Sequence, residues 1–270
     1  MEFIWQLFSA IILAVIEGIT EFLPVSSIGH TVLVESFLGL KTPPSKVFEI
    51  SIQFGAILSV CVVYAKELWQ VVRGVPRNAN AQRLVLGLFI AFLPAAAFGV
   101  LLSAWITVYL FSPFVVSVAM IAGGVGILAI ERGLRFPRYF SVEDFPLLLF
   151  VKIGLCQCLA LIPGVSRSGA TIMGSMLMGV ERAAAAEFSF LLAIPTMLGA
   201  TVYSLYANWQ SLHLTDLFFI SVGFVIAFLS AYPVVERFVA YVSRRGFGIF
   251  AWYRIILGSF MLGWFIIRGG

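Results

Sequence analysis

Long apolar runs alternate with short polar breaks along this chain, and six of the runs are long enough to cross a lipid bilayer. A transmembrane helix needs about 20 predominantly apolar residues. The pattern therefore predicts six transmembrane helices, three in each half of the chain, with no room between them for a soluble domain. The predicted spans lie near residues 47–65, 84–105, 112–131, 186–206, 215–236 and 248–267.

Two further apolar segments are interrupted by proline, serine and glycine before they become clean spans. Segment 3–23 ends at Pro24 and is followed by the short apolar run 28–40. Segment 145–162 ends at Pro163, and a second short run follows. Irregular backbone at membrane depth is tolerated only inside protein or beside a watery cavity. Each interrupted segment is therefore predicted to form a re-entrant helical hairpin.

The two halves of the chain repeat one another. Glu49-Ile-Ser51 recurs as Glu187-Phe-Ser189, and Ile90-Ala-Phe-Leu93 recurs as Ile226-Ala-Phe-Leu229. Each half then holds one hairpin and three spans, and this odd number of crossings inverts the second half, even if each hairpin counts as two full spans. The predicted fold class is an all-α integral membrane protein with an inverted-topology repeat, which places a site near the midplane where the repeats meet. The predicted single membrane domain is 1–270, with repeats at 1–135 and 141–270.

The composition supports a membrane protein. The chain is 61% hydrophobic and 11% charged, with a mean hydropathy of +1.05, whereas soluble domains have about 25% charged residues. The net charge is only +4, and we expect no nucleic-acid partner. Cys61, Cys156 and Cys158 are odd in number, lie in apolar runs and lack the usual zinc spacing. They are therefore expected to pack in the protein interior.

The basic residues fall unevenly on the two sides of this predicted topology. Lys and Arg concentrate in the cytoplasmic loops of membrane proteins, so the bias predicts a cytoplasmic basic face and both termini outside. Lys152, Arg167 and Arg254 belong to neither side because they fall within membrane segments. The eleven residues of the basic side are Lys66, Arg73, Arg77, Arg83, Arg132, Arg135, Arg138, Arg182, Arg237, Arg244 and Arg245, and the three of the other side are Lys41, Lys46 and Arg268.

Two carboxylates lie within the first interrupted segment. Charged side chains inside membrane sequence are energetically costly, which makes them functional candidates. Glu17 and Glu21 are four residues apart, so they share one helix face, where they repel unless something positive lies between them. The candidates are a divalent cation (Mg²⁺, Ca²⁺ or Mn²⁺), a shared proton or an arginine. The alternative is a solvated helix face near the membrane interface.

Serines follow the proline in both interrupted segments. Ser26 and Ser27 precede the first short helix, and Ser166 and Ser168 stand at the start of the second. Capping explains one serine in each case. The free backbone N–H groups and positive dipole at a helix start also bind phosphate. If the hairpins enter from opposite faces, the two helix starts meet near the midplane.

Two arginines, a threonine and a histidine complete the candidate site. Arg167 adds a bidentate cation suited to phosphate, and Thr171 adds a hydroxyl one helical turn further on. His30 lies one turn after the first serine pair and is a candidate nucleophile, general acid or general base, although a lone histidine is more often structural. Arg254, one turn into the last span, is either a second phosphate ligand or a partner for a carboxylate.

These residues fit two function classes. One is a hydrolase acting on a lipid-linked phosphate, and the other is a transporter, because inverted repeats are common among transporters. A histidine, two serines, an arginine and a carboxylate pair in one cluster favour the hydrolase, since a transporter needs only to bind and release. A purely structural scaffold would not place these groups in apolar sequence.

Two segments resemble the signatures of one bacterial family. Residues 17–30 read Glu-Gly-Ile-Thr-Glu-Phe-Leu-Pro-Val-Ser-Ser-Ile-Gly-His, and residues 163–171 read Pro-Gly-Val-Ser-Arg-Ser-Gly-Ala-Thr. Both resemble bacterial undecaprenyl-pyrophosphate phosphatase of the bacitracin-resistance type, with no departure in either motif. The resemblance spans essentially the whole chain and includes residues 187–193 and 253–254.

The resemblance implies a phosphatase that depends on a divalent cation. The family removes one phosphate from the C55 polyprenyl pyrophosphate carrier, and the monophosphate re-enters the synthesis of peptidoglycan and other cell-wall polymers. We therefore expect a multi-pass protein of the bacterial cytoplasmic (inner) membrane, with its site open to the outer face. Expected partners are the lipid substrate and membrane lipids, with a homodimer as a candidate assembly. The runner-up is a transporter or flippase of a lipid-linked phosphate.

The motifs and the resemblance together assign a role to each candidate. The predicted catalytic residues are Glu21, Ser27, His30 and Arg167. The predicted phosphate-binding residues are Ser26, Ser166, Ser168, Thr171 and Arg254, and the predicted metal ligands are Glu17 and Glu21. The motifs leave the nucleophile open between serine, histidine and water.

Overall fold

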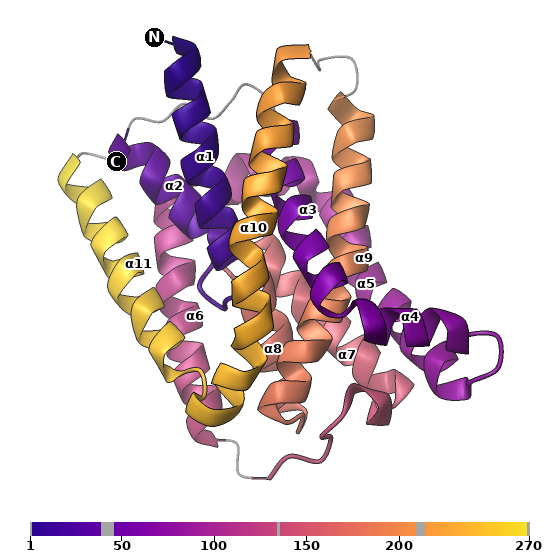
Figure 1. Ribbon diagram of the computed structural model, residues 1–270. Helices are drawn as coiled ribbons and strands as arrows, with labels where there is room; N and C mark the ends of the chain where they lie inside the picture. Colours follow the sequence, from indigo (N-terminus) through magenta and orange to yellow (C-terminus); the bar gives the residue numbers. More distant parts are fainter. Residues whose placement is uncertain (1, 39–45, 134–135, 209–213, 269–270) are drawn as a thin grey trace.

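The computed structural model describes residues 2–38, 46–133, 136–208 and 214–268, and these are almost entirely helical, as predicted (Figure 1). Within these ranges there is no β-strand, only an isolated bridge between Tyr139 and Val180. The elements in chain order are α1 (Glu2–Thr20), α2 (Ser27–Leu38), α3 (Lys46–Val63), α4 (Ala65–Gly74), α5 (Ala79–Trp105), the π-helix η1 (Ile106–Leu110), α6 (Pro113–Gly133), the 3₁₀ helix η2 (Val142–Asp144), α7 (Leu147–Gln157), the 3₁₀ helix η3 (Cys158–Leu161), α8 (Arg167–Leu177), α9 (Arg182–Asn208), α10 (Leu214–Arg245) and α11 (Gly248–Arg268).

Six helices of the described chain are long and apolar enough to cross a membrane, so this is a multi-pass membrane protein. Five of them, α5 continued by η1, α6, α9, α10 and α11, correspond to predicted spans. The sixth is α1, whose apolar stretch Phe3–Thr20 reaches spanning length. The sequence pattern had set this segment apart from the clean spans, because its last turns carry carboxylates and end at a proline.

The remaining predicted span, 47–65, forms α3 and is followed by a sharp bend. The chain turns by 76° between α3 and α4, and only the two helices together meet the length and hydropathy of a span. No described residue of α4 is buried, and the guanidinium of Arg73 lies 4.7 Å from the centre of the Trp69 ring. α4 is therefore a charged surface helix rather than a continuation of the span.

The first hairpin reverses between α1 and α2. Residues 21–25 form turns and include Pro24, which has no backbone N–H to continue a helix. Ser26 follows with φ of 71°, the one non-glycine residue of the described chain in the left-handed region. α2 then leads back beside α1 and packs against it (Figure 1).

The second hairpin reverses between α7 and α8. α7 tightens into η3, and Ile162 is extended, with φ −78° and ψ 118°, as a residue that precedes proline usually is. Gly164 has φ of 94°, a conformation that glycine adopts without strain, and α8 packs back against α7. Both interrupted segments therefore form a helix, a turn and a short helix.

The two halves of the chain pack against each other in matching pairs. α1 packs against α10 of the second half, and α7 packs against α5 of the first half. A Cβ atom at Gly18 would lie 2.5 Å from the Ala227 carbonyl oxygen, and a Cβ atom at Gly154 would lie 2.5 Å from the Ala91 carbonyl oxygen. Only glycine permits so close an approach. Both alanines belong to the repeated Ile-Ala-Phe-Leu sequence.

Aromatic rings fix the first turn against the helices of the second half. Phe22 is fully buried next to the turn, and its ring centre lies 5.3 Å from that of Phe190 on α9. Phe190 in turn lies 5.6 Å from Phe238 on α10. Edge-to-face and tilted ring pairs at such distances are favourable beyond the area they bury, so this chain of rings holds the turn that carries Glu21.

Apart from Arg167 and Arg254 at the hairpin turns and Arg268 at the end of α11, the described arginines gather at one end of the molecule. The start of α1, the start of α10 and the end of α11 lie at the opposite end (Figure 1). Arg132 follows Glu131 near the end of α6, Arg182 pairs with Glu131 across 3.3 Å, and Arg244 and Arg245 end α10. This segregation agrees with the charge pattern, although Lys41 and Arg135 lie outside the described residues.

Candidate active site

Each short helix begins with a serine cap, as the sequence predicted. The Ser26 hydroxyl oxygen accepts a hydrogen bond from the Gly29 N–H at 3.3 Å. The Ser166 hydroxyl oxygen accepts one from the Gly169 N–H at 3.1 Å. Each cap satisfies one of the N–H groups that a helix start leaves unpaired. The first helical residues are then Ser27 in α2 and Arg167 in α8.

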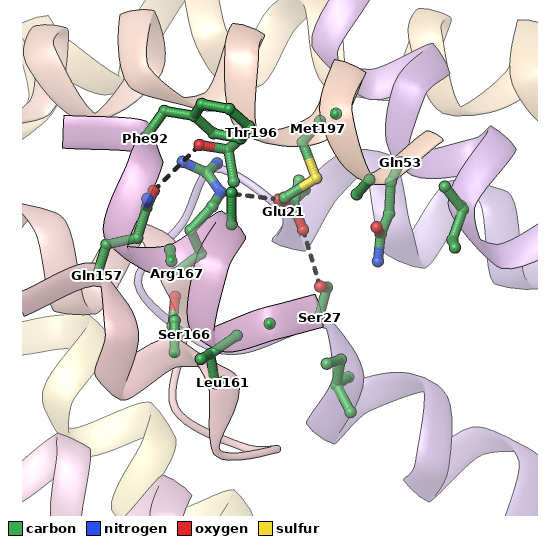
Figure 2. Close-up of a pocket in the computed structure, with 18 of the residues that line it drawn as sticks. Glu21, Ser27, Gln53, Phe92, Gln157, Leu161, Ser166, Arg167, Thr196 and Met197 are labelled. Carbon is green, nitrogen blue, oxygen red and sulfur yellow. Dashed lines mark hydrogen bonds and ion pairs between the residues drawn. The ribbon is translucent and has the colours of Figure 1, made fainter. Parts of the chain in front are cut away.

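These two first residues meet on one carboxylate. The Ser27 hydroxyl donates to Glu21 Oε2 at 2.9 Å, and Arg167 Nε donates to Glu21 Oε1 at 3.3 Å (Figure 2). All three side chains are buried. We call this arrangement the Ser27–Glu21–Arg167 junction. It confirms the prediction that the two helix starts meet, and it joins residues that lie 146 positions apart in the sequence.

A second contact joins the hairpins through the backbone. The Ser168 hydroxyl donates to the Leu23 carbonyl oxygen at 2.9 Å. The Ser166 hydroxyl lies 2.9 Å from the Ser168 hydroxyl and 3.4 Å from the same carbonyl. These two serines, predicted to bind phosphate, therefore hold the first turn against the start of α8. Ser166 also lines the cavity described below, whereas Ser168 is fully buried.

Arg254 of α11 holds both turns from behind. It is only 1% exposed, and its guanidinium donates to the carbonyl oxygens of Pro24 at 3.0 Å and Gly164 at 3.0 Å. It also donates to the carbonyls of Ala119 and Met120 on α6, each at 3.2 Å. The sequence predicted a phosphate ligand here, but these contacts direct the side chain to backbone carbonyls and away from the cavity wall. We call this arrangement the Arg254 clamp.

His30 is also directed toward the first turn. Its Nδ1 lies 2.7 Å from the Ser26 carbonyl oxygen, and its Nε2 lies 2.7 Å from the Tyr253 hydroxyl. A carbonyl can only accept, so Nδ1 carries a proton, and in the neutral ring Nε2 accepts from Tyr253. The two rings are stacked at 5.5 Å. His30 is therefore buried against Ser26, which itself lines the cavity described below. The catalytic role predicted for His30 stays a prediction.

The far side of Arg167 is tied to α9. Arg167 Nη1 donates to the Ser189 carbonyl oxygen at 3.1 Å. The Thr171 hydroxyl lies 2.7 Å from the Ser189 hydroxyl and also donates within α8. Arg167 Nη2 is buried and has no hydrogen-bond partner among the residues that the structure describes. Thr171, predicted to bind phosphate, therefore contacts the same residue, Ser189, that anchors Arg167, while one Arg167 nitrogen is left without a partner among the described residues.

Glu17 lies one helical turn before Glu21. The Glu21 N–H donates to the Glu17 carbonyl at 2.9 Å, which continues the helical geometry, so the two carboxylates follow one another along α1. Glu17 is buried, and its Oε1 has no partner within the described ranges. In the same part of the chain no three His, Cys, Asp or Glu side chains gather into a metal cluster. Two carboxylates do suit a cation such as Mg²⁺, which takes its other ligands from water and substrate phosphates.

A cavity of about 480 Å³ opens at the junction. Its polar wall contains Glu21, Ser26, Ser27, Ser166 and Arg167, so five of the predicted site residues line it. Most of the remaining wall is apolar and comes from α3, α5, η3 and α9. The predicted residues that do not line it are Glu17, His30, Ser168, Thr171 and Arg254.

Comparisons with known proteins identify the family to which the chain belongs. A sequence profile of the family described as "Bacitracin resistance protein BacA" matches residues 10–260. The chain belongs to the BacA family. A protein of Parvibaculum lavamentivorans named undecaprenyl-diphosphatase is 52% identical over 256 residues, which covers 95% of this chain and 96% of the relative. Undecaprenyl-diphosphatase 2 of Paramagnetospirillum magneticum is 51% identical over 261 residues, 96% of this chain and 99% of the relative. Undecaprenyl-diphosphatase 1 of Agrobacterium fabrum is 48% identical over 265 residues, 98% of each chain.

The sequence pattern of this BacA-family chain missed four residues that build the site. Ser189 and Tyr253 anchor Arg167 and His30, and Gln157 and Thr196 line the cavity. Tyr253 adjoins Arg254 in a segment that carries the family resemblance, which was the available signal for it. Gln157 had a signal as well, since it is a polar residue in an otherwise apolar run, but the sequence pattern assigned it no role.

The arrangement combines an acceptor with several donors at one end of an apolar cavity. The Glu21 carboxylate accepts a hydrogen bond from the Ser27 hydroxyl. A base placed next to a hydroxyl in this way can activate that hydroxyl, or a water beside it, as a nucleophile. Arg167 and the N–H groups at the starts of α2 and α8 form a donor set that suits an anion. The site can therefore hold a phosphate at its polar end and an apolar group beyond it.

Proposed function

We propose that this chain is a hydrolase that converts undecaprenyl pyrophosphate to undecaprenyl phosphate and inorganic phosphate. The relatives that match it over nearly their whole length are named undecaprenyl-diphosphatases. The product is the lipid carrier that re-enters the synthesis of peptidoglycan and other cell-wall polymers. The observation that carries the proposal is the Ser27–Glu21–Arg167 junction, because it joins a hydroxyl, a carboxylate and a guanidinium at the polar end of a mainly apolar cavity.

Arg167 and the two helix starts hold the pyrophosphate. Phosphoryl transfer depends mainly on positioning and on neutralising the oxygens of the phosphate that moves. The free Arg167 Nη2 provides a charged donor, and Ser26 and Ser166 place capped helix N-termini beside it. Ser168 and Thr171 support these groups from behind, and Arg254 fixes the two turns from which both helices start.

Glu21 acts as the base toward the attacking group. It already accepts the Ser27 hydroxyl at 2.9 Å, so it can take the proton of Ser27 or of a water held beside it. The attack forms a bond to the terminal phosphorus and breaks the anhydride bond, and the lipid monophosphate leaves. Attack by water gives inorganic phosphate directly, whereas attack by Ser27 gives a phosphoserine that a water must then hydrolyse to release inorganic phosphate. His30 stays among the proposed catalytic residues because its partner Ser26 lines the cavity.

Glu17 and Glu21 are the proposed ligands of a divalent cation, Mg²⁺, Ca²⁺ or Mn²⁺. The unpaired buried oxygen of Glu17 supports this assignment, because a buried carboxylate oxygen needs a positive partner. When bound, the cation supplies charge neutralisation at the pyrophosphate. Glu21, the next carboxylate along the same helix face of α1, would supply a second oxygen while it also accepts from Ser27 and Arg167.

The prenyl tail occupies the apolar part of the cavity, and the site opens outward. Ile50 near the start of α3, Val100 near the end of α5 and Tyr203 near the end of α9 line the cavity. α9 ends at the same end of the molecule as the start of α1 (Figure 1). The positive-inside bias assigns that end to the outer face of the cytoplasmic (inner) membrane, with both termini outside.

The proposed architecture is an inverted repeat over residues 1–135 and 141–270, in which each half holds one re-entrant hairpin and three spans, all within a single membrane domain. Residues 1, 39–45, 134–135, 209–213 and 269–270 of these repeats lie outside the described ranges. The support is the matched packing, in which Gly18 approaches Ala227 while Gly154 approaches Ala91. An exchange of the two halves converts the first contact into the second.

A transporter or flippase of a lipid-linked phosphate is the less favoured alternative. A transporter would not need the Ser27–Glu21 hydroxyl–carboxylate pair, and the relatives are named as diphosphatases rather than as transporters. A homodimer is a candidate assembly, and the mass of the purified protein in detergent decides it. Membrane lipids are the expected surroundings of the exposed apolar helix faces.

The deciding experiment is release of inorganic phosphate from C55 polyprenyl pyrophosphate by the purified chain, with and without a chelator. We expect stoichiometric conversion to the monophosphate, abolished by the chelator and restored by a divalent cation. A Ser27→Ala, Glu21→Gln double variant provides the matched negative. The absence of release by the wild-type chain with every cation would refute the proposed function.

A further inference from the structure

Gln157, the last residue of α7, presents a buried amide to the cavity. Its side chain is only 2% exposed and lines the cavity wall. Gln157 Oε1 lies 3.3 Å from the Thr196 hydroxyl, which also lies 2.8 Å from the Leu192 carbonyl and shares its hydrogen between the two. Gln157 Nε2 has no hydrogen-bond partner among the described residues. A buried N–H group without a partner is unfavourable and calls for an acceptor that the protein does not itself supply.

Arg167 provides a second buried donor in the same cavity wall that has no acceptor in the described part of the chain. Arg167 lines the cavity with Gln157 (Figure 2). Arg167 Nε pairs with Glu21 and Nη1 pairs with Ser189, but Nη2 has no partner within the part of the chain that is described. Two buried donors on one cavity wall, both without acceptors, indicate a ligand that brings several acceptor oxygens at once.

The repeat gives Gln157 a counterpart. Gly18 and Gly154 make equivalent contacts in the two halves, each against the carbonyl of a repeated alanine. Three residues after them stand Glu21 and Gln157. The Glu21 carboxylate of the first half is therefore matched by the Gln157 amide, a side chain of the same length, in the second half. Where Glu21 has a second acceptor oxygen, Gln157 has an NH₂ group that donates.

The two short helices also begin with residues of different chemistry in the two halves. Ser27 and Arg167 are the first residues of α2 and α8. The first half of the site therefore presents a hydroxyl and a carboxylate, and the second half presents a guanidinium and an amide. One wall suits the attacking group and its base, and the other suits the phosphate oxygens.

We infer that Gln157 binds the pyrophosphate directly, with its Nε2–H donating to a phosphate oxygen beside Arg167 Nη2. The inference rests on the proposed function and deepens it, because it assigns a substrate-binding residue that neither sequence motif contains. The Thr196 hydroxyl orients the amide so that its N–H group faces the cavity. Glutamate would be excluded at this position because its charge would repel the phosphate and would pair with Arg167.

The test compares Gln157→Glu, Gln157→Met and Thr196→Val with the wild-type chain. Gln157→Glu keeps the size of the side chain, Gln157→Met removes both polar atoms, and Thr196→Val removes only the orienting hydroxyl. Gln53→Met is the matched control, because Gln53 lines the same cavity from α3 and appears apart from Gln157 in Figure 2. Thermal unfolding in detergent identifies any variant that fails to fold.

We expect kcat/KM of Gln157→Met to fall about 10-fold to 150-fold, mainly through KM, as expected for the loss of a hydrogen bond to a charged group. Gln157→Glu should lose more at neutral pH. Its activity relative to wild type should recover as the pH falls, because a protonated carboxyl regains an O–H donor. Thr196→Val should change kcat/KM in the same direction by less, and inhibition by inorganic pyrophosphate should weaken in parallel with KM.

The outcomes separate this inference from the proposed function. If the wild-type chain releases no phosphate, the proposed function fails. If the wild-type chain is active and folded Gln157→Met matches it, Gln157 does not bind the substrate. Equal losses in Gln157→Met and Gln53→Met would overturn the specific assignment, and a pH-independent deficit in Gln157→Glu would indicate a packing role instead.

Discussion

Replacement of Arg167 by lysine tests the centre of the proposed site. Two Arg167 nitrogens have partners, Nε with Glu21 at 3.3 Å and Nη1 with the Ser189 carbonyl at 3.1 Å, and we propose that the third, Nη2, which has no partner among the described residues, binds the substrate. A lysine ammonium is a single point charge on a flexible chain and cannot keep this planar fork. Arg167→Lys therefore keeps the charge but gives up one or two of the three contacts.

The size of the effect follows from the contact that faces the substrate. A hydrogen bond to a charged group contributes about 1.5–3 kcal/mol, and about 1.4 kcal/mol corresponds to a tenfold change in rate. We therefore expect kcat/KM to fall about 10-fold to 150-fold. If lysine follows Glu21 and withdraws from the cavity, the loss lies at the upper end of this range.

The assay is phosphate release from C55 polyprenyl pyrophosphate, with thermal unfolding in detergent as the check on folding. Arg182→Lys is the matched control, because Arg182 also pairs with a carboxylate, Glu131 at 3.3 Å, but is 41% exposed. Exposed ion pairs contribute about 0–1 kcal/mol, so this variant should stay within about twofold of wild type. Near-wild-type turnover by folded Arg167→Lys would remove Arg167 from the substrate contacts.

Four further predictions concern the junction and its surroundings. Glu17→Gln, Glu21→Gln and the double variant should show non-additive losses of phosphate release and of cation dependence, because residues that act as one unit fail together; multiplicative losses would argue against a shared cation. Arg254→Lys should lower the stability by about 1–3 kcal/mol, since an ammonium cannot reach all four carbonyls and leaves at least one buried carbonyl unpaired, and an unchanged unfolding temperature in detergent would contradict the clamp. With the three native cysteines replaced, Ser27→Cys should react with an impermeant thiol reagent added outside intact cells, and labelling only from inside would reverse the orientation. Ser27→Cys and Ser166→Cys together should join through a cross-linker shorter than about 10 Å, roughly one helix diameter, and failure at every such length would contradict a site built from both motifs.

Hydropathy alone predicted most of the helices that can cross a membrane. Residues 84–105 and 248–267 became α5 and α11 with nearly the same bounds, because a span requires a length of apolar sequence and little else. Hydropathy did not predict the 76° bend between α3 and α4. A bend of this kind depends on how a charged surface helix settles against its neighbours, and a linear pattern does not contain that information.

The sequence motifs predicted the parts of the site in which side chains contact one another, but not the contacts between side chains and backbone carbonyls. Motif spacing brought Ser27, Glu21 and Arg167 together, because helix starts and ionisable groups leave a clear trace in apolar sequence. The partners of Arg254 could not be recognised from the sequence, because they are backbone carbonyls, which every residue possesses. Gln157 was missed for another reason: six residues separate Gly18 from Pro24, but nine separate Gly154 from Pro163.

That difference in spacing hides the equivalence of Glu21 and Gln157 from any alignment made on the prolines. The extra residues belong to η3, the 3₁₀ helix that tightens the end of the second long segment. An alignment on the prolines pairs Gln157 with Gly18 instead of Glu21. The three-dimensional contacts of the glycines were needed to restore the register.

The Arg254 clamp has a consequence for how the protein is made. Its guanidinium bonds to carbonyls that lie 230 and 90 positions earlier in the chain, so α11 is synthesised after both hairpins. The first hairpin is inserted early, yet its turn cannot take its final position until α11 has also entered the bilayer. A nascent or truncated chain that lacks α11 therefore holds every residue of the two motifs without the contacts that fix their turns.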